Sequence, residues 1–117
     1  MAKLYRTPQI KEDYKEIFKE SAKRFGERVA RQTLLQIQQA ESRVLANPHY
    51  GTLDPKFHST KFRYVQAKNR QKLFYTTIGE DVIVMITAGY DGRNWIKLLT
   101  EMDGYISQQI EQARQNR

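Results

Sequence analysis

A run of basic residues interleaved with aromatic ones is the part of this sequence that most clearly points to chemistry. Between Asp54 and Glu80 there is no acidic residue, while cations and aromatic side chains recur throughout the interval. The cations are Lys56, Lys61, Arg63, Lys68, Arg70 and Lys72, and the aromatics are Phe57, Phe62, Tyr64, Phe74 and Tyr75. Such a composition favours a surface that meets a polyanion, either nucleic acid or an acidic protein segment. A solvated basic face whose rings point into a core is the alternative.

Other kinds of site find little support. His49 and His58 stand nine residues apart in a loop region with only Asp54 between them, which is poor spacing for zinc. The glycine-containing stretch 89–92 lacks the Lys and Ser/Thr of a phosphate-binding loop, and the sequence has no cysteine for a disulfide or a metal thiolate. We therefore expect no metal and no cofactor.

The size and charge of the chain fit one domain over residues 1–117. The sequence has 20 Lys plus Arg and 13 Asp plus Glu, a net charge of +7, and outside the basic run 14 cations (20 minus 6) nearly balance the 13 anions. A chain of this length can bury one core without staples. No apolar run approaches the roughly 20 residues of a membrane span. The N-terminus has no apolar stretch of signal-peptide length, so we expect a cytoplasmic protein.

Two helices are expected in the first half of the sequence. Thr7-Pro8 predicts a capped helix start and Gly26 its end. The apolar stripe of this helix is Ile10, Tyr14, Ile17, Phe18, Ala22 and Phe25. The Glu and Lys residues between them predict a solvated face rather than catalytic carboxylates. A second helix from about Glu27 to Ala46 should run antiparallel to the first, because a single glycine joins the two.

Strands and a further helix are expected in the rest of the chain. Alternating or β-branched residues predict strands at 3–6, about 61–66, 72–78 and 82–88, the last of them buried on both faces. Gly89 and Gly92 should end this strand, and a C-terminal helix should run from about Trp95 to Arg114, as part of a segment 95–117 whose polar end from Gln108 to Arg117 should fray. The apolar stripe of that helix should face its own domain, with a homodimer contact as the alternative. The order predicts an α+β domain, in which a short N-terminal strand and a helical hairpin pack on a small antiparallel sheet (β-α-α-β-β-β), followed by a C-terminal helix.

Short motifs are spread along these elements. They are Arg24-Phe25-Gly26, Leu34 and Leu45, Asn47-Pro48 followed by Gly51, Phe62-Arg63, Lys72-Leu73-Phe74-Tyr75, Val82-Ile83-Val84, and Arg93. Together with the element order, over about residues 3 to 99, they resemble the RelE/ParE superfamily of bacterial toxins. The resemblance implies the toxin of a type II toxin–antitoxin module, neutralised by a cognate acidic antitoxin.

The resemblance implies different site residues for the two activities of this superfamily. RelE-like members are ribosome-dependent mRNA endonucleases, which need a group to accept the 2′-hydroxyl proton and cations to stabilise the phosphate. By position, Lys61 would accept the proton, while Arg63, Lys72 and Arg93 would hold the phosphate. ParE-like members have a similar shape but poison DNA gyrase.

The stretch after Arg93 favours the ParE-like alternative. It has no tyrosine or histidine at the family's distance, since Tyr90 precedes Arg93 and Tyr105 lies too far along the terminal helix. The long helical hairpin also matches ParE-like members better. We therefore expect a gyrase poison, with an mRNA endonuclease and a non-toxic module that binds nucleic acid or protein as alternatives. The expected target-binding residues are Lys56, Lys61, Arg63, Lys68, Arg70, Lys72, Tyr90 and Arg93.

Overall fold

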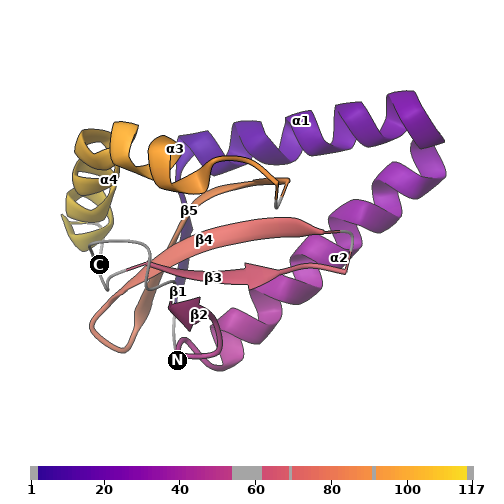
Figure 1. The fold of residues 1–117 in the computed structure, drawn as a ribbon. Helices are drawn as coiled ribbons and strands as arrows, with labels where there is room; N and C mark the ends of the chain where they lie inside the picture. The colour runs from indigo at the N-terminus through magenta and orange to yellow at the C-terminus, as the bar shows by residue number, and fades with distance from the viewer. Residues whose placement is uncertain (1–2, 54–61, 69, 91, 116–117) are drawn as a thin grey trace.

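A computed structural model of the chain describes residues 3–53, 62–68, 70–90 and 92–115. The elements are β1 (Lys3–Arg6), α1 (Pro8–Phe25), α2 (Glu27–Ala46), β2 (Thr52–Leu53), β3 (Arg63–Gln66), β4 (Gln71–Ile78), β5 (Val82–Tyr90), α3 (Trp95–Glu101) and α4 (Asp103–Gln115). They build the predicted α+β domain, with one five-stranded sheet and helices on both of its sides (Figure 1).

The sheet is organised around β5. The strand order is β1-β5-β4-β3-β2. Every residue of β5 from Val82 to Gly89 is buried, and burial was predicted for residues 82–88. β5 runs parallel to β1 and antiparallel to β4, so the sheet is mixed rather than wholly antiparallel as expected. The short strand β2, which the sequence did not predict, pairs with β3.

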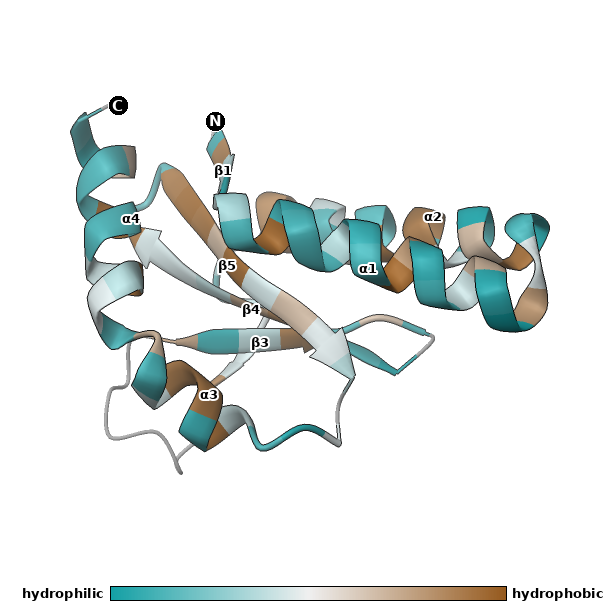
Figure 2. Cartoon of the chain, turned by 90° about the horizontal axis from the view of Figure 1, so that it is seen from above, coloured by the Kyte–Doolittle hydropathy of each residue, from teal (hydrophilic) through white to brown (hydrophobic). Residues whose placement is uncertain are grey.

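Two hydrophobic cores lie on opposite faces of this sheet. Successive residues of a strand point to opposite faces, so Leu73 and Tyr75 face the α1–α2 hairpin while Phe74 faces α3 and α4. The hairpin-side core includes Ile10, Ile37, Ala40, Val44, Leu73, Tyr75, Ile83 and Met85. The other core includes Phe74, Val82, Val84, Ile86, Trp95, Leu99, Ile106 and Ala113. Both layers of helices therefore stabilise the same central strands (Figure 2).

The ends of the hairpin helices agree with the predicted boundaries. The Thr7 hydroxyl accepts a hydrogen bond from the Ile10 amide at 3.1 Å and donates to the Ile86 carbonyl at 2.7 Å, so the cap also fixes α1 to β5. Gly26 joins the helices with a φ of 92°, a backbone conformation that other residues rarely adopt. The prediction that Phe25 packs inward is wrong, because the ring is 67% exposed where the hairpin extends beyond the sheet (Figure 2).

Two boundaries in the last part of the chain differ from the prediction. β5 continues through Gly89 to Tyr90. Arg93 and Trp95 pack against the strand at Gly89, where a β-carbon would lie 3.1 Å from each of their side chains. Glycine therefore allows this close approach within the strand. The terminal helix is broken at Met102 into α3 and α4, and its apolar stripe packs on the sheet of the same chain. Within the described residues, no helix has the length and apolarity needed to cross a membrane.

A buried carboxylate joins β1 and the two hairpin helices. Glu41 of α2 is 5% exposed and accepts hydrogen bonds from Arg6 Nε at 3.0 Å, Arg6 Nη2 at 2.8 Å and Tyr14 Oη at 2.6 Å. Burial, and then the neighbouring Glu41 charge, raise the pKa of Tyr14 far above its ordinary value. The bond to Glu41 also raises the pKa of Arg6. Glu41 is thus a charged residue on the buried side of α2.

Removal of Arg6 should destabilise the fold far more than removal of a surface arginine. Arg6→Met keeps much of the stem but leaves the Glu41 charge buried beside Tyr14 alone, so we expect a loss of about 3 kcal/mol in the free energy of unfolding. Urea denaturation measures the change. The control is Arg31→Met, which breaks the exposed ion pair with Glu27 and should cost less than about 1 kcal/mol. Equal losses in the two variants would contradict this role for Glu41.

Alkaline pH should weaken the fold through Tyr14. The folded state keeps a phenol proton that the unfolded chain releases above its ordinary pKa of about 10, so stability is lost as the pH rises beyond that value. Between about pH 10 and 11 the free energy of unfolding should fall more steeply for the wild type than for Tyr14→Phe, by up to about 1.4 kcal/mol per pH unit. Urea titrations across this range measure both slopes. Parallel curves would rule out the contribution of Tyr14.

Candidate functional site

The side chain of Arg63 holds a loop on the hairpin-facing side of the sheet. Its Nη1 donates to the Gly51 carbonyl at 2.8 Å and, at 3.4 Å, to that of His49. Arg63 pairs across the strands with Tyr75, whose hydroxyl donates to the Pro48 carbonyl at 2.9 Å and accepts from the Gly51 amide at 2.8 Å. Burial raises the pKa of Tyr75. Any side chain at Gly51 would collide with the Tyr75 ring, so this contact requires glycine.

Lys72 and Arg93 are related to Gly89 in different ways: Lys72 pairs with it across the strands, whereas the side chain of Arg93 lies against it. Lys72 of β4 is the cross-strand partner of Gly89, and its Nζ lies 4.5 Å from the centre of the Tyr64 ring. The Arg93 guanidinium lies over Gly89 and 5.9 Å from the Trp95 ring. Both charges are therefore close to aromatic faces, which attract cations and leave the charged groups accessible.

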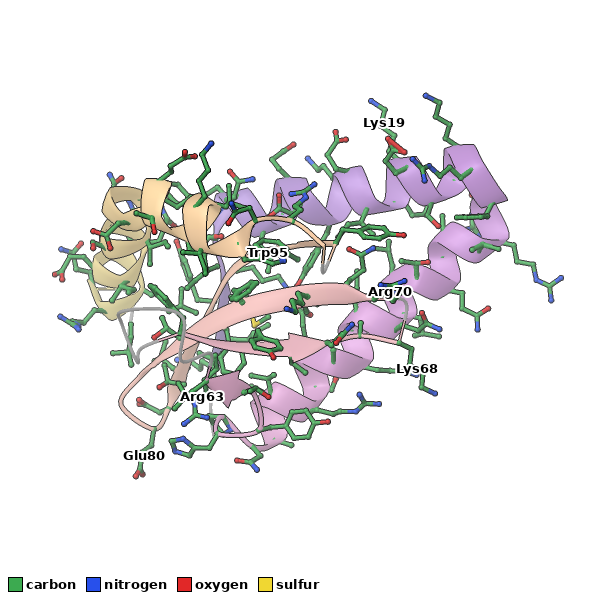
Figure 3. The ribbon with its side chains drawn as sticks, in the orientation of Figure 1. Lys19, Arg63, Lys68, Arg70, Glu80 and Trp95 are labelled. Carbon is green, nitrogen blue, oxygen red and sulfur yellow. The ribbon has the colours of Figure 1, made fainter. Side chains whose placement is uncertain are left out.

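The other cations of the basic run are dispersed. Lys68 and Arg70 are exposed in the β3–β4 turn beside α2, at the far end of β3 from Arg63 (Figure 3). Lys56 and Lys61 lie outside the described residues. Tyr90, at the end of β5, is 56% exposed. The structure thus places the backbones of Lys72, Tyr90 and Arg93 near the end of β5, while Arg63 lies at the other end of β3 from Lys68 and Arg70.

This arrangement can bind an anion, but the described residues do not assemble the predicted cleavage site. Arg63 and Lys72 are on opposite faces of the sheet, so the two cannot hold one phosphate from the same side. The hydroxyl of Tyr105 has a structural partner, because it accepts a hydrogen bond from the Gln9 amide at 2.9 Å. Within the described part of the chain, no three His, Asp or Glu side chains are grouped so that they could hold a metal ion.

A cavity of about 520 Å³ opens between the helical hairpin and the end of β5. Tyr90 and Arg93 line it on one side, and the α1 residues Asp13, Glu16 and Glu20 line it on the other. Asp13 anchors this wall, because its carboxylate accepts hydrogen bonds from the Thr87 hydroxyl and the Ala88 amide of β5. The sequence predicted only a solvated face for these glutamates. The long-range contact of Asp13 leaves no local signal that could have revealed the cavity.

Replacement of Arg63 should affect folding more than replacement of Lys72, because Arg63 holds the 48–51 loop whereas Lys72 makes an accessible contact with Tyr64. Arg63→Ala removes a charged donor from the 48–51 loop, and we expect a loss of about 1–2 kcal/mol in the free energy of unfolding. Lys72→Ala, the matched control on the other face, removes an accessible cation–π contact and should cost less than about 1 kcal/mol. Chemical denaturation measures both. A larger loss for Lys72→Ala would show that the assignment of these two roles is mistaken.

The comparisons with known proteins bear on the fold. No family model matches the sequence, and no curated protein matches it significantly. A solved structure of the chromosomal ParDE toxin–antitoxin (TA) system from P. aeruginosa has a TM-score of 0.65 at 15% identity, covering 77% of this chain and 96% of that chain. A conserved hypothetical protein from Helicobacter pylori has a TM-score of 0.44 at 19% identity, covering 76% and 93%. The chain thus shares its fold with a chain of the ParDE structure.

Proposed function

We propose that this chain is the toxin of a toxin–antitoxin module, that it inhibits growth by poisoning DNA gyrase, and that a cognate acidic antitoxin neutralises it. The observation that carries the proposal is the fold shared with the ParDE structure, which extends over 96% of that chain. The motifs and element order resembling the RelE/ParE superfamily support the same conclusion from the sequence. The net charge of +7 suits an acidic partner.

The distribution of the cations supports a binding surface rather than a nuclease centre. A ribonuclease needs its cations to converge on one phosphate. Arg63 is instead bound to loop carbonyls on the hairpin-facing side, while Lys72 and Arg93 lie around Gly89 on the other. Together with the missing tyrosine or histidine after Arg93, this favours a gyrase poison over a ribosome-dependent endonuclease.

The surface around Gly89 is the part of the chain that we assign to the target. Arg93 lies against Gly89, Lys72 pairs with Gly89 across the strands, and Tyr90 follows Gly89 in the chain with more than half of its surface exposed. Exposed aromatic and arginine side chains are typical of contacts that contribute strongly to binding. The antitoxin would act by covering this surface or by holding it away from the target. The homodimer contact through the C-terminal helix stays a prediction, and the packing of its apolar stripe within the chain gives it no support.

Induced expression of the chain in a bacterium should arrest growth and activate the DNA-damage response. Purified protein incubated with gyrase and supercoiled plasmid should accumulate cleaved DNA. The double substitution Lys72→Ala/Arg93→Ala should reduce both effects by at least about tenfold, because it removes two charges from the assigned surface. Co-expression of an acidic protein encoded beside the chain should restore growth.

The matched control is Lys19→Ala, an exposed cation on α1 (Figure 3), which should leave toxicity unchanged. Cuts in mRNA on ribosomes, with undamaged DNA, would contradict gyrase poisoning and favour the endonuclease. Normal growth in the presence of folded, soluble protein would contradict toxicity itself and favour a non-toxic binding module.

A further inference from the structure

The cavity between the hairpin and the end of β5 has a chemistry opposite to that of the chain as a whole. Its lining includes three carboxylates from one side of α1, at Asp13, Glu16 and Glu20, in a protein with a net charge of +7. Two cations, Arg24 and Arg93, also line it. Three anions against two cations leave a local charge of −1 among the described lining residues.

Two of these three carboxylates, Asp13 and Glu16, form no ion pair with any residue that the structure describes. Glu20 pairs with Arg24 at 3.5 Å, an exposed contact of small energetic weight. Asp13 receives hydrogen bonds from Gln9, Thr87 and Ala88, which are all neutral donors. Glu16 has no hydrogen bond or ion pair with any residue that the structure describes. Asp13 and Glu16 thus present negative charge to the cavity.

A buried amide on the strand side gives an independent indication of a ligand. Gln71 begins β4 on the same face as Leu73 and Tyr75, so its side chain is directed towards the hairpin, and it lines the cavity. The residue is only 8% exposed, and its Oε1 accepts no hydrogen bond within the described part of the chain. A buried acceptor without a donor is unfavourable, and an N–H group in the cavity would correct this.

The rest of the lining includes three large apolar residues of the hairpin beside the polar Ser21, Thr33 and Tyr90. Ile17, Phe25 and Val29 lie along the hairpin side of the cavity, and Phe25 and Val29 are respectively 67% and 43% exposed. The volume of about 520 Å³ falls in the range typical of small-molecule sites. An occupant that matches all of these features has an apolar stem and a positively charged group that donates hydrogen bonds.

We propose that this cavity binds a small organic cation, an ammonium or guanidinium group carried on a short alkyl chain. Its N–H groups donate to Gln71 Oε1, its charge lies near Asp13 and Glu16, and its stem covers Ile17, Phe25 and Val29. The carboxylates and the unsatisfied acceptor select a cation over an anion. This inference does not depend on toxicity, a nucleic acid or an antitoxin.

The direct test is calorimetric titration of the full chain with agmatine, in which a butyl chain joins a guanidinium to an ammonium. At physiological salt we expect saturable binding at a single site and a rise in melting temperature. Succinate and butanol are the comparison probes, and neither should bind measurably. Absence of agmatine binding, or succinate binding as tight as that of agmatine, would overturn the proposal.

Substitution of a lining carboxylate, compared with a control on the same helix, links the binding to this cavity. Glu16→Gln should weaken agmatine binding about threefold to fivefold, because it removes one partly solvated charge. Glu12→Gln is the matched control on the same helix: its partner is Lys15 at 3.3 Å, it does not line the cavity, and its replacement should leave the affinity unchanged. An equal effect of the two variants would mean non-specific attraction and would overturn the proposal.

Gln71→Leu separates a ligand-binding role from a structural one. It removes the unsatisfied acceptor while it keeps a similar volume, so the melting temperature of the free protein should stay the same or rise. Agmatine affinity should nevertheless fall about tenfold. Unchanged affinity in a folded Gln71→Leu protein would overturn the proposal. If this variant does not fold, the comparison of Glu16→Gln with Glu12→Gln decides.

Discussion

The fold depends on one buried carboxylate. Glu41 lies where β1, α1 and α2 meet, and its carboxylate accepts hydrogen bonds from both Arg6 and Tyr14. A buried charge tolerates little loss of its partners, so these three elements are held in one relative position. Asp13 precedes Tyr14 on α1 and reaches the end of β5. Once Tyr14 is bound to Glu41, α1 is therefore oriented so that its carboxylates line the cavity.

The basic run shows how a strand pair redistributes charge. Of the six cations that are close in the sequence, Arg63 in β3 and Lys72 in β4 lie on opposite faces of the sheet, and Lys68 and Arg70 lie in the turn that connects these strands. Arg63 becomes a structural contact of the 48–51 loop, while the Lys72 ammonium lies over the Tyr64 ring on the other face. The net charge of the chain therefore contributes long-range attraction to an anion. Direct contact with that anion depends on the few cations that stay accessible.

Local signals in the sequence were sufficient for most of the secondary structure. Thr7, Pro8 and Gly26 set the ends of α1 through capping and a positive φ, and the β-branched run identified β5. The contacts that the sequence did not predict join residues far apart in the chain. Glu41 lies 35 residues from Arg6, and Gly89 continues a strand only because Arg93 and Trp95 pack against it. The parallel pairing of β1 with β5 is likewise set by tertiary packing, which a single sequence does not encode in any short motif.

Arg93 connects the two surfaces described above. Its guanidinium lies over Gly89, and it also lines the acidic cavity, where its positive charge opposes a cationic occupant. Selection within the cavity therefore has to come from Asp13 and Glu16 on α1, which have no ion pair with any residue that the structure describes, and from the amide of Gln71 on β4. Because strand alternation directs Gln71 towards the hairpin and Lys72 towards the opposite face, adjacent residues of β4 present an acceptor on one side and a cation on the other. The end of β5 can thus offer opposite chemistry to two different ligands without a change in fold.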